Sequence, residues 1–222
     1  MPVLRAPIVR EIRPRFRGSS HKWAFFASLI TGVVLVLLAP TDKATTAAAI
    51  YAASVSGLFG ASALYHGVTW RPAARRWMRR LDHSMIFVLI AGTYTPFGLL
   101  LLTGTLATVV LAVVWGGALA GVLMKLAWVD APKWLMAAVY VALGWVGAAT
   151  MPQLLSRGGI GAVALLAAGG LLYTAGAVIY ALRRPDPRPA VFGYHEVFHV
   201  LVIVAAAAHY AAIVGYALPA HA

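Results

Sequence analysis

The chain has 222 residues, of which 62% are hydrophobic and only 11% are charged. A soluble domain of this length cannot hide so much apolar surface in its interior, so the composition excludes a soluble enzyme and indicates a membrane protein. The sequence contains no cysteine, which excludes disulfides, thiolate metal ligands and thiol nucleophiles. Basic loops between apolar segments explain the formal charge of +12, so we expect no nucleic-acid partner.

Seven apolar runs follow one another along the chain, each close to the roughly 20 residues that cross a bilayer as a helix. They cover residues 23–39, 44–65, 85–102, 106–126, 134–151, 159–182 and 194–217. Breakers and charged residues mark the connections, at 40–43, 70–80, 103–105, 130–133, 152–158 and 183–189. The sequence therefore predicts an all-α polytopic membrane protein, with a seven-helix transmembrane domain over residues 23–217. A basic segment, 1–22, precedes this domain, and a short tail, 218–222, follows it.

Basic residues predict the orientation of the bundle, because Lys and Arg are retained on the cytoplasmic side of short loops. Sixteen of them lie in the N-terminal segment and in the second, fourth and sixth connections: Arg5, Arg10, Arg13, Arg15, Arg17, Lys22, Arg71, Arg75, Arg76, Arg79, Arg80, Lys125, Lys133, Arg183, Arg184 and Arg188. Only Lys43 and Arg157 lie opposite them. This predicts a cytoplasmic N-terminus and a C-terminus outside. The same arginine-rich loops should favour anionic lipid headgroups at the cytoplasmic face.

Ionisable side chains from three predicted helices converge at one depth under this topology. His66 ends the second helix, Asp82 opens the third, and His195 and His199 open the seventh, all at the cytoplasmic face. Residues four apart share a helix face, so His195 and His199 can present two imidazoles to one ion. Ser62 lies on the same face as His66 for the same reason. We therefore predict a metal site formed by His66, His195 and His199.

Three histidines form a zinc site with an open fourth position, where the metal lowers the pKa of water to about 7. Asp82 could orient that water or transfer its proton. Residues 195–199 also match the H-E-x-x-H pattern of zinc metalloproteases, which makes Glu196 a second candidate base. That pattern is weak alone, because it leaves two positions free. For four other histidines taken singly, a structural role at the membrane edge or in a polar crevice is favoured: His21, His83, His209 and His221.

A polar segment, 92–96, interrupts the third run, where Pro96 frees a backbone carbonyl and Gly92 permits close packing. The segment either lines a cavity leading from Asp82 toward the membrane centre or only kinks the helix. All four lysines lie at membrane edges, so none could carry a retinal Schiff base, and a photoreceptor is excluded. A transporter lacks support, because the middle of the membrane carries no charge.

Four ordered motifs resemble the hemolysin III family, the bacterial branch of the progestin and adipoQ receptors that include the adiponectin receptors. The motifs are Ser62-x-x-x-His66 and residues 81–86, 91–96 and 193–199, and the likeness covers nearly the whole chain from residue 17 onward. The resemblance implies a seven-helix bundle in the bacterial inner membrane that holds zinc through three histidines, matched here by His66, His195 and His199. It also implies that Asp82 and Ser62 support the water at the zinc.

The same resemblance implies a function. The site of the family is similar in design to that of the alkaline ceramidases, and some bacterial members are linked to membrane-lipid homeostasis. We therefore expect a zinc-dependent hydrolase that cleaves an amide or ester bond of a membrane lipid. The alternative is a non-enzymatic, hemolysin-type membrane protein in which zinc only ties helices together. Residues 11–14 echo a motif of the eukaryotic receptors, but the Gly-Glu that should follow is missing, so receptor function gains no support.

Overall fold

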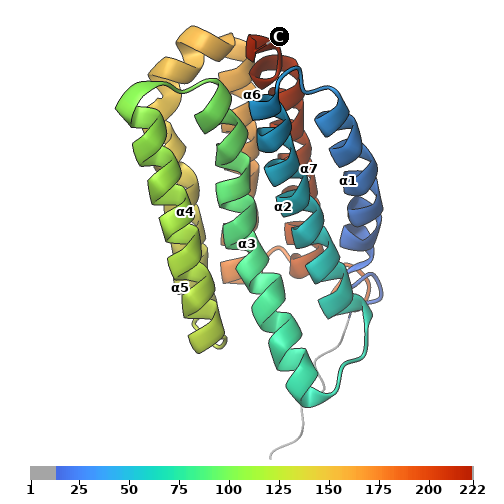
Figure 1. The fold of residues 1–222 in the computed structure, drawn as a ribbon. Helices are drawn as coiled ribbons and strands as arrows, with labels where there is room; N and C mark the ends of the chain where they lie inside the picture. Colours follow the sequence, from blue (N-terminus) through green and yellow to red (C-terminus); the bar gives the residue numbers. More distant parts are fainter. Residues whose placement is uncertain (1–13, 222) are drawn as a thin grey trace, which may run out of the picture.

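A computed structural model describes residues 14–221, which form a bundle of long helices (Figure 1). The elements in order are α1 (Ser19–Leu37), α2 (Asp42–Gly67), α3 (Pro72–Leu100), α4 (Gly104–Ala127), α5 (Lys133–Gly144), η1 (Trp145–Thr150), α6 (Met151–Leu182), α7 (Tyr194–Ala212), η2 (Ile213–Ala217) and η3 (Pro219–His221). α1 packs on α2, α2 on α3, α3 on α4, α5 on α6 and α6 on α7, and α1 also contacts α7. The basic residues before Pro14, the 11–13 part of the receptor-like motif and the His221 side chain lie outside the described part of the chain.

Six helical segments of the described chain are long and apolar enough to cross a membrane. Five of them match the first four predicted runs and the last one. The sixth, Lys133–Leu182, has 50 residues and covers both the fifth and the sixth predicted runs. The residues predicted as a connection at 152–158 are helical, and α6 begins at Met151. Pro152 lies in the first turn of α6, where a proline costs the helix no hydrogen bond.

Within Lys133–Leu182, α5 and α6 pack against each other, so the chain reverses direction between them. The reversal includes η1 and the first turns of α6 up to Gly159, where φ is 75° and ψ is 177°. Glycine adopts this backbone conformation without the strain that a side chain would add. Figure 1 shows this stretch at the end of the bundle where the C-terminus lies.

The arginine-rich segment 70–80, predicted as a connection, is helical from Pro72 onward. Proline is favoured at the first helical position, and the following Ala, Arg and Met residues are strong helix formers. Asp82 therefore does not open the third helix as predicted. It lies about 15 Å along α3 from Pro72, at about 1.5 Å per residue. The helix also continues past Pro96 to Leu100.

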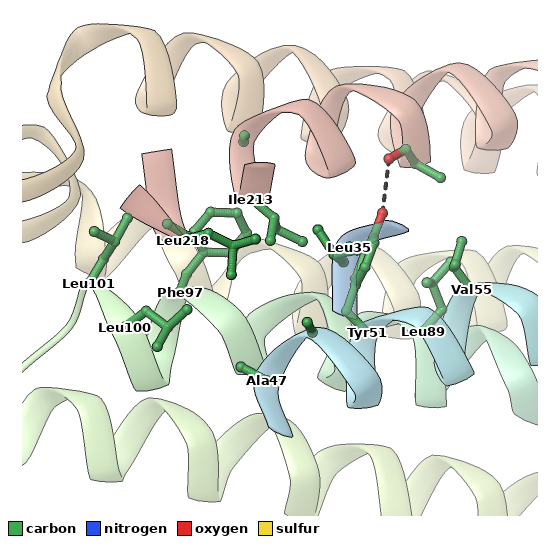
Figure 2. Packing of buried hydrophobic residues seen from close by; sticks show 14 of the residues in the cluster. Leu35, Ala47, Tyr51, Val55, Leu89, Phe97, Leu100, Leu101, Ile213 and Leu218 are labelled. Atoms are coloured by element: carbon green, nitrogen blue, oxygen red, sulfur yellow. Dashed lines mark hydrogen bonds between the residues drawn. The ribbon is translucent and has the colours of Figure 1, made fainter. Parts of the chain in front are cut away.

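A cluster of buried apolar side chains fills the interior of the bundle (Figure 2). Leu35, Ala47, Leu101 and Ile213 belong to it, and Tyr51 donates a 2.9 Å hydrogen bond from its hydroxyl to the Ala206 carbonyl oxygen. Many large apolar side chains point outward instead, especially along α1 and α4. Lipid is as apolar as these side chains, so helix association depends on close packing rather than on hydrophobic burial.

Small residues allow that close packing, and Gly121 on α4 is a clear case. A Cβ at Gly121 would overlap the ring of Phe87 on α3, whereas a Cβ at Gly116 of the same helix would meet no atom within 4 Å. We expect Gly121→Val to destabilise the protein by about 1–3 kcal/mol through overpacking. Thermal unfolding in detergent, followed by tryptophan fluorescence, measures the effect. Gly116→Val is the matched control, and an equal loss in both variants would contradict the prediction.

Candidate metal centre

Three buried histidines from two helices meet at one point of the bundle. One ring nitrogen of each of His66, His195 and His199 lies within 4.8 Å of the corresponding atoms of the other two. The Nε2 atoms of His66 and His195 are 3.2 Å apart. The sequence places these residues at one depth, and the structure places them in one cluster.

The helices position each of these imidazoles. His66 lies in the last turn of α2, while His195 and His199 lie in the first two turns of α7, four residues apart on one face. The ring centroids of His195 and His199 are 4.5 Å apart, and those of His66 and His199 are 5.2 Å apart. The cluster therefore ties the end of one helix to the start of another.

Glu196 helps to start α7 and does not face the cavity beside the cluster. Its Oε2 accepts a 2.9 Å hydrogen bond from the backbone N–H of Gly193, which satisfies a free donor at the helix start. Its Oε1 lies 3.3 Å from Nη1 of Arg17, which precedes α1. Glu196 is not one of the described residues that line the cavity. The match to H-E-x-x-H thus reflects two histidines of the cluster with a helix-capping carboxylate between them.

Asp82 lies beside the histidine cluster. Its Oδ2 is 3.9 Å from Nε2 of His66 and 3.6 Å from Nδ1 of His83. The carboxylate also interacts with the hydroxyl of Ser62. Both predicted partners of the histidines, Asp82 and Ser62, therefore adjoin the cluster from α3 and α2. A carboxylate at this distance can act on an ion or substrate at His66 through one water.

His21 belongs to the same site, although the sequence favours a purely structural role for it. Its ring stacks on that of His199 with centroids 3.7 Å apart and an interplanar angle of 9°. Its Nδ1 lies 2.8 Å from Oγ of Ser62. The only signal in the sequence is its place in a polar stretch just before the first apolar run. Its neighbours become clear only when α1 packs against α2 and α7.

Two other histidines remain outside the cluster. His209 lies ten residues beyond His199 on α7, and its Nε2 is 3.3 Å from the carbonyl oxygen of Leu166. His83 places its Nδ1 2.7 Å from the carbonyl oxygen of Arg79, one turn earlier on α3. Both are therefore held by backbone carbonyls, which fits the structural role expected for them.

A cavity of about 400 Å³ adjoins the cluster and extends into the bundle. Ser62, Asp82, His195 and His199 line it at the cluster, while His209 and mostly apolar side chains line the rest. Its lining includes α3 residues from Arg79 to Phe97. At about 1.5 Å per residue this is a distance of about 27 Å. The polar segment 92–96 contributes Thr93 and Tyr94, so the cavity predicted beside this segment is present.

The donor set suits a metal ion. Two nitrogens bound to one tetrahedral ion at about 2.0–2.1 Å are about 3.4 Å apart. The 3.2 Å between the Nε2 atoms of His66 and His195 is close to that value. His199 also keeps a buried ring nitrogen, Nδ1, without a hydrogen-bond partner in the described part of the chain. Imidazole nitrogens are the commonest protein ligands for transition metals. The three histidines could therefore hold a metal ion.

Comparison with known proteins agrees with the motifs. The sequence matches the family described as Haemolysin-III related over residues 9–210. It is 31% identical over 198 residues to Hemolysin-3 of Bacillus cereus, covering 87% of each chain. It is 34% identical over 168 residues to the Hemolysin-3 homolog of Bacillus subtilis (strain 168), covering 75% of each chain. Monocyte to macrophage differentiation factor of Homo sapiens is 25% identical over 201 residues, which are 89% of this chain and 81% of that protein.

These relatives and the six apolar helices establish a multi-pass membrane protein, and a bacterial inner membrane is consistent with both. The match covers nearly all of the described bundle, including every residue of the histidine cluster. The resemblance found in the sequence motifs is thereby confirmed. The chain belongs to the haemolysin III-related family.

Proposed function

We propose that the protein is a zinc-dependent hydrolase that cleaves an amide or ester bond of a membrane lipid, with a role in membrane-lipid homeostasis. The observation that carries this proposal is the buried cluster of His66, His195 and His199 at the end of a long, mainly apolar cavity. Zinc held by three histidines acts as a Lewis acid toward a carbonyl and activates water. An apolar cavity of this kind suits a lipid chain.

The side chains around the cluster have separate roles in the proposed reaction. Asp82 accepts the proton of the attacking water and returns it to the leaving group, so that one water is consumed for each bond cleaved. Ser62 holds the Asp82 carboxylate, with which it interacts. His21 in turn holds Ser62 through the 2.8 Å contact and supports the His199 ring by stacking. These groups form one connected polar network at the mouth of the apolar cavity.

The proposal includes seven membrane crossings, a cytoplasmic N-terminus and a C-terminus outside. The packing of α5 against α6 supports two crossings within Lys133–Leu182. Figure 1 shows α1 starting at one end of the bundle and the C-terminus at the other, which an odd number of crossings requires. Exposed tryptophans near the site support a membrane interface there, namely Trp23, Trp77, Trp128 and Trp134. The site then lies in the cytoplasmic leaflet, where Lys and Arg are abundant.

A lipid reaches such a site from the side. A second hollow lies between α5 and α6, and it shares four lining residues with the main cavity: Ala137, Val141, Thr174 and Ala177. These small and apolar side chains separate the interior from the lipid-facing surface. A lipid chain can pass between the two helices where they part, without leaving the bilayer.

Chelation tests the proposed activity. We expect the purified protein in nanodiscs to hydrolyse a fluorescent acyl-amide lipid such as ceramide, to lose this activity after chelation, and to regain it when zinc is returned. The physical reason is that a zinc ion at the three histidines would both polarise the scissile carbonyl and lower the pKa of the attacking water. Turnover that persists in chelator would contradict a zinc-dependent reaction.

A second candidate function is membrane lysis, because two of the relatives carry the name hemolysin. In that case a metal at the cluster would only tie α2 to α7. Lysis of red cells by the purified protein measures this activity. Lysis that persists when His66, His195 and His199 are all replaced, together with the absence of lipid hydrolysis, would favour this function over the hydrolase.

A further inference from the structure

Three cationic side chains line the cavity at the same end as the histidine cluster. Arg79 comes from α3, Lys125 from the end of α4 and Lys133 from the start of α5. Figure 1 shows these parts of the three helices at one end of the bundle. They come from helices other than α2 and α7, which carry the histidines. The cations therefore line the same end of the cavity as the histidines but lie on other helices.

Lys125 is the most unusual member of this group. Its side chain is only 1% exposed, although lysine is almost never fully buried without a partner. Within residues 14–221 it makes no hydrogen bond and no ion pair. The opposite charge that acts on its ammonium is that of the exposed Asp130, which already pairs with Arg79, and a buried ammonium without a full counter-charge is disfavoured. A group that enters the cavity can supply that counter-charge.

The partners of the other two cations do not neutralise the cavity. Arg79 donates a hydrogen bond to Asp130, but that carboxylate is 75% exposed and does not line the cavity. The Lys133 ammonium donates a 3.0 Å hydrogen bond to the hydroxyl of Tyr194 and lies 4.7 Å from the centroid of the Tyr180 ring. Both of these partners are neutral. Asp82 is the single carboxylate among the described lining residues, so positive charge is in excess.

The three charges act on a common space. Each of them interacts electrostatically with His83, the neighbour of Asp82 on α3. Lys125 and Arg79 also repel each other. Like charges held close together in a region of low dielectric constant are stabilised by an anion placed between them. The cavity at the site proposed for hydrolysis therefore attracts negative charge.

We propose that Arg79, Lys125 and Lys133 form an anion subsite that binds the phosphate or carboxylate of a lipid headgroup while the lipid chain occupies the cavity. This inference rests on the proposed function and adds to it a preference for lipids with an anionic group close to the bond that is cleaved, with neutral lipids remaining weaker substrates. Arginine binds such oxyanions through two parallel hydrogen bonds, and lysine binds them as a point charge. Neutral lipids such as ceramide would leave the subsite empty and bind more weakly.

Lipid binding to the full-length protein in nanodiscs tests the subsite without requiring turnover. We expect phosphatidic acid to bind more tightly than ceramide, measured by displacement of a fluorescent fatty acid. Lys125→Gln should weaken phosphatidic acid binding by about 10- to 100-fold, because a hydrogen bond to a charged group is lost. Binding of ceramide should stay the same. Lys125→Arg, which keeps the charge, should retain most of the preference for the anionic lipid.

Controls separate the subsite from general charge and from folding. Arg76→Gln removes an exposed cation three residues from Arg79 that does not line the cavity, and it should leave both affinities unchanged. Equal affinity of the wild type for the two lipids, or an unchanged affinity in Lys125→Gln, would overturn the proposal. A thermal unfolding scan checks that each variant is folded. If Lys125→Gln is not folded, the affinity of Lys133→Gln for phosphatidic acid is measured in its place.

Two further arms identify the source of the anion and keep this test apart from the hydrolase test. Inorganic phosphate at millimolar concentration should not displace the lipid, and displacement would assign the subsite to free phosphate instead. Binding is repeated with His195→Ala, which is expected to lack the metal. Preference for the anionic lipid should persist there, since it depends on the cations. If His195→Ala loses hydrolysis but keeps the preference for the anionic lipid, the result supports both proposals. If the wild type shows no hydrolysis but keeps this preference, the result contradicts only the proposed function.

Discussion

Under the proposed function, purified His195→Ala protein is expected to contain little or no zinc. His195 supplies the nitrogen nearest to that of His66, 3.2 Å away, so its removal leaves two ligands that cannot enclose an ion. Loss of an outer-shell partner alone lowers metal affinity by about 10- to 100-fold, and loss of a direct ligand should exceed that range. Zinc content by inductively coupled plasma mass spectrometry, together with competition against a chromophoric chelator, measures the change.

His209→Ala is the matched control for this experiment. His209 is also buried on α7 and also lines the cavity, but its ring is held by the Leu166 carbonyl oxygen and does not belong to the cluster. We expect this variant to keep the zinc content of the wild type. Retention of zinc by His195→Ala would contradict the proposed metal site, and with it the zinc-dependent hydrolase.

Asp82→Asn should abolish most of the lipid hydrolysis while zinc stays bound. The substitution keeps the size of the side chain but removes the group that accepts the proton of the attacking water. A positioned general base contributes about 10²- to 10⁴-fold to the rate, so kcat should fall by about this factor. The KM for the lipid should change little, because the apolar cavity that binds the chain is unaltered. Steady-state kinetics and zinc content on the same preparation give both quantities.

Glu196→Gln distinguishes the two candidate bases. The Glu196 carboxylate accepts the Gly193 N–H and pairs with Arg17, so its loss should weaken the start of α7. Removal of a capping interaction costs about 0.5–2 kcal/mol. We therefore expect a lower unfolding temperature and a kcat close to that of the wild type. A large fall in kcat in Glu196→Gln, with full activity in Asp82→Asn, would reverse the two roles.

The general class of this protein could be predicted from the sequence alone. Bilayer thickness imposes a minimum length on each apolar run, and this requirement is local in the chain. The histidine cluster was also predictable, because successive spans alternate in direction and residues at matching ends share a depth. His195 and His199 needed only the helical repeat to share a face. The prediction that His66 joins them depended on the alternation of spans, because His66 and His195 are 129 positions apart in sequence.

The connections between spans were harder to predict. Pro72 and Pro152 lie in segments predicted as connections, yet each is in the first turn of a helix, where proline is tolerated. A proline in sequence does not by itself reveal on which side of it the helix lies. The start of α3 and the helical structure of residues 152–158 therefore differ from what the sequence predicts. Both errors concern the ends of helices, where local preference is weak.

The neighbours of each side chain around the site were decided by the tertiary structure. Lipid is as apolar as a helix interior, so these helices carry no strong polar face that would reveal their rotation about their axes. The stacking of His21 on His199, the capping role of Glu196 and the burial of Lys125 all depend on that rotation. Sequence determined which ionisable groups lie near the same end of the bundle. Packing between helices determined which of them face one another.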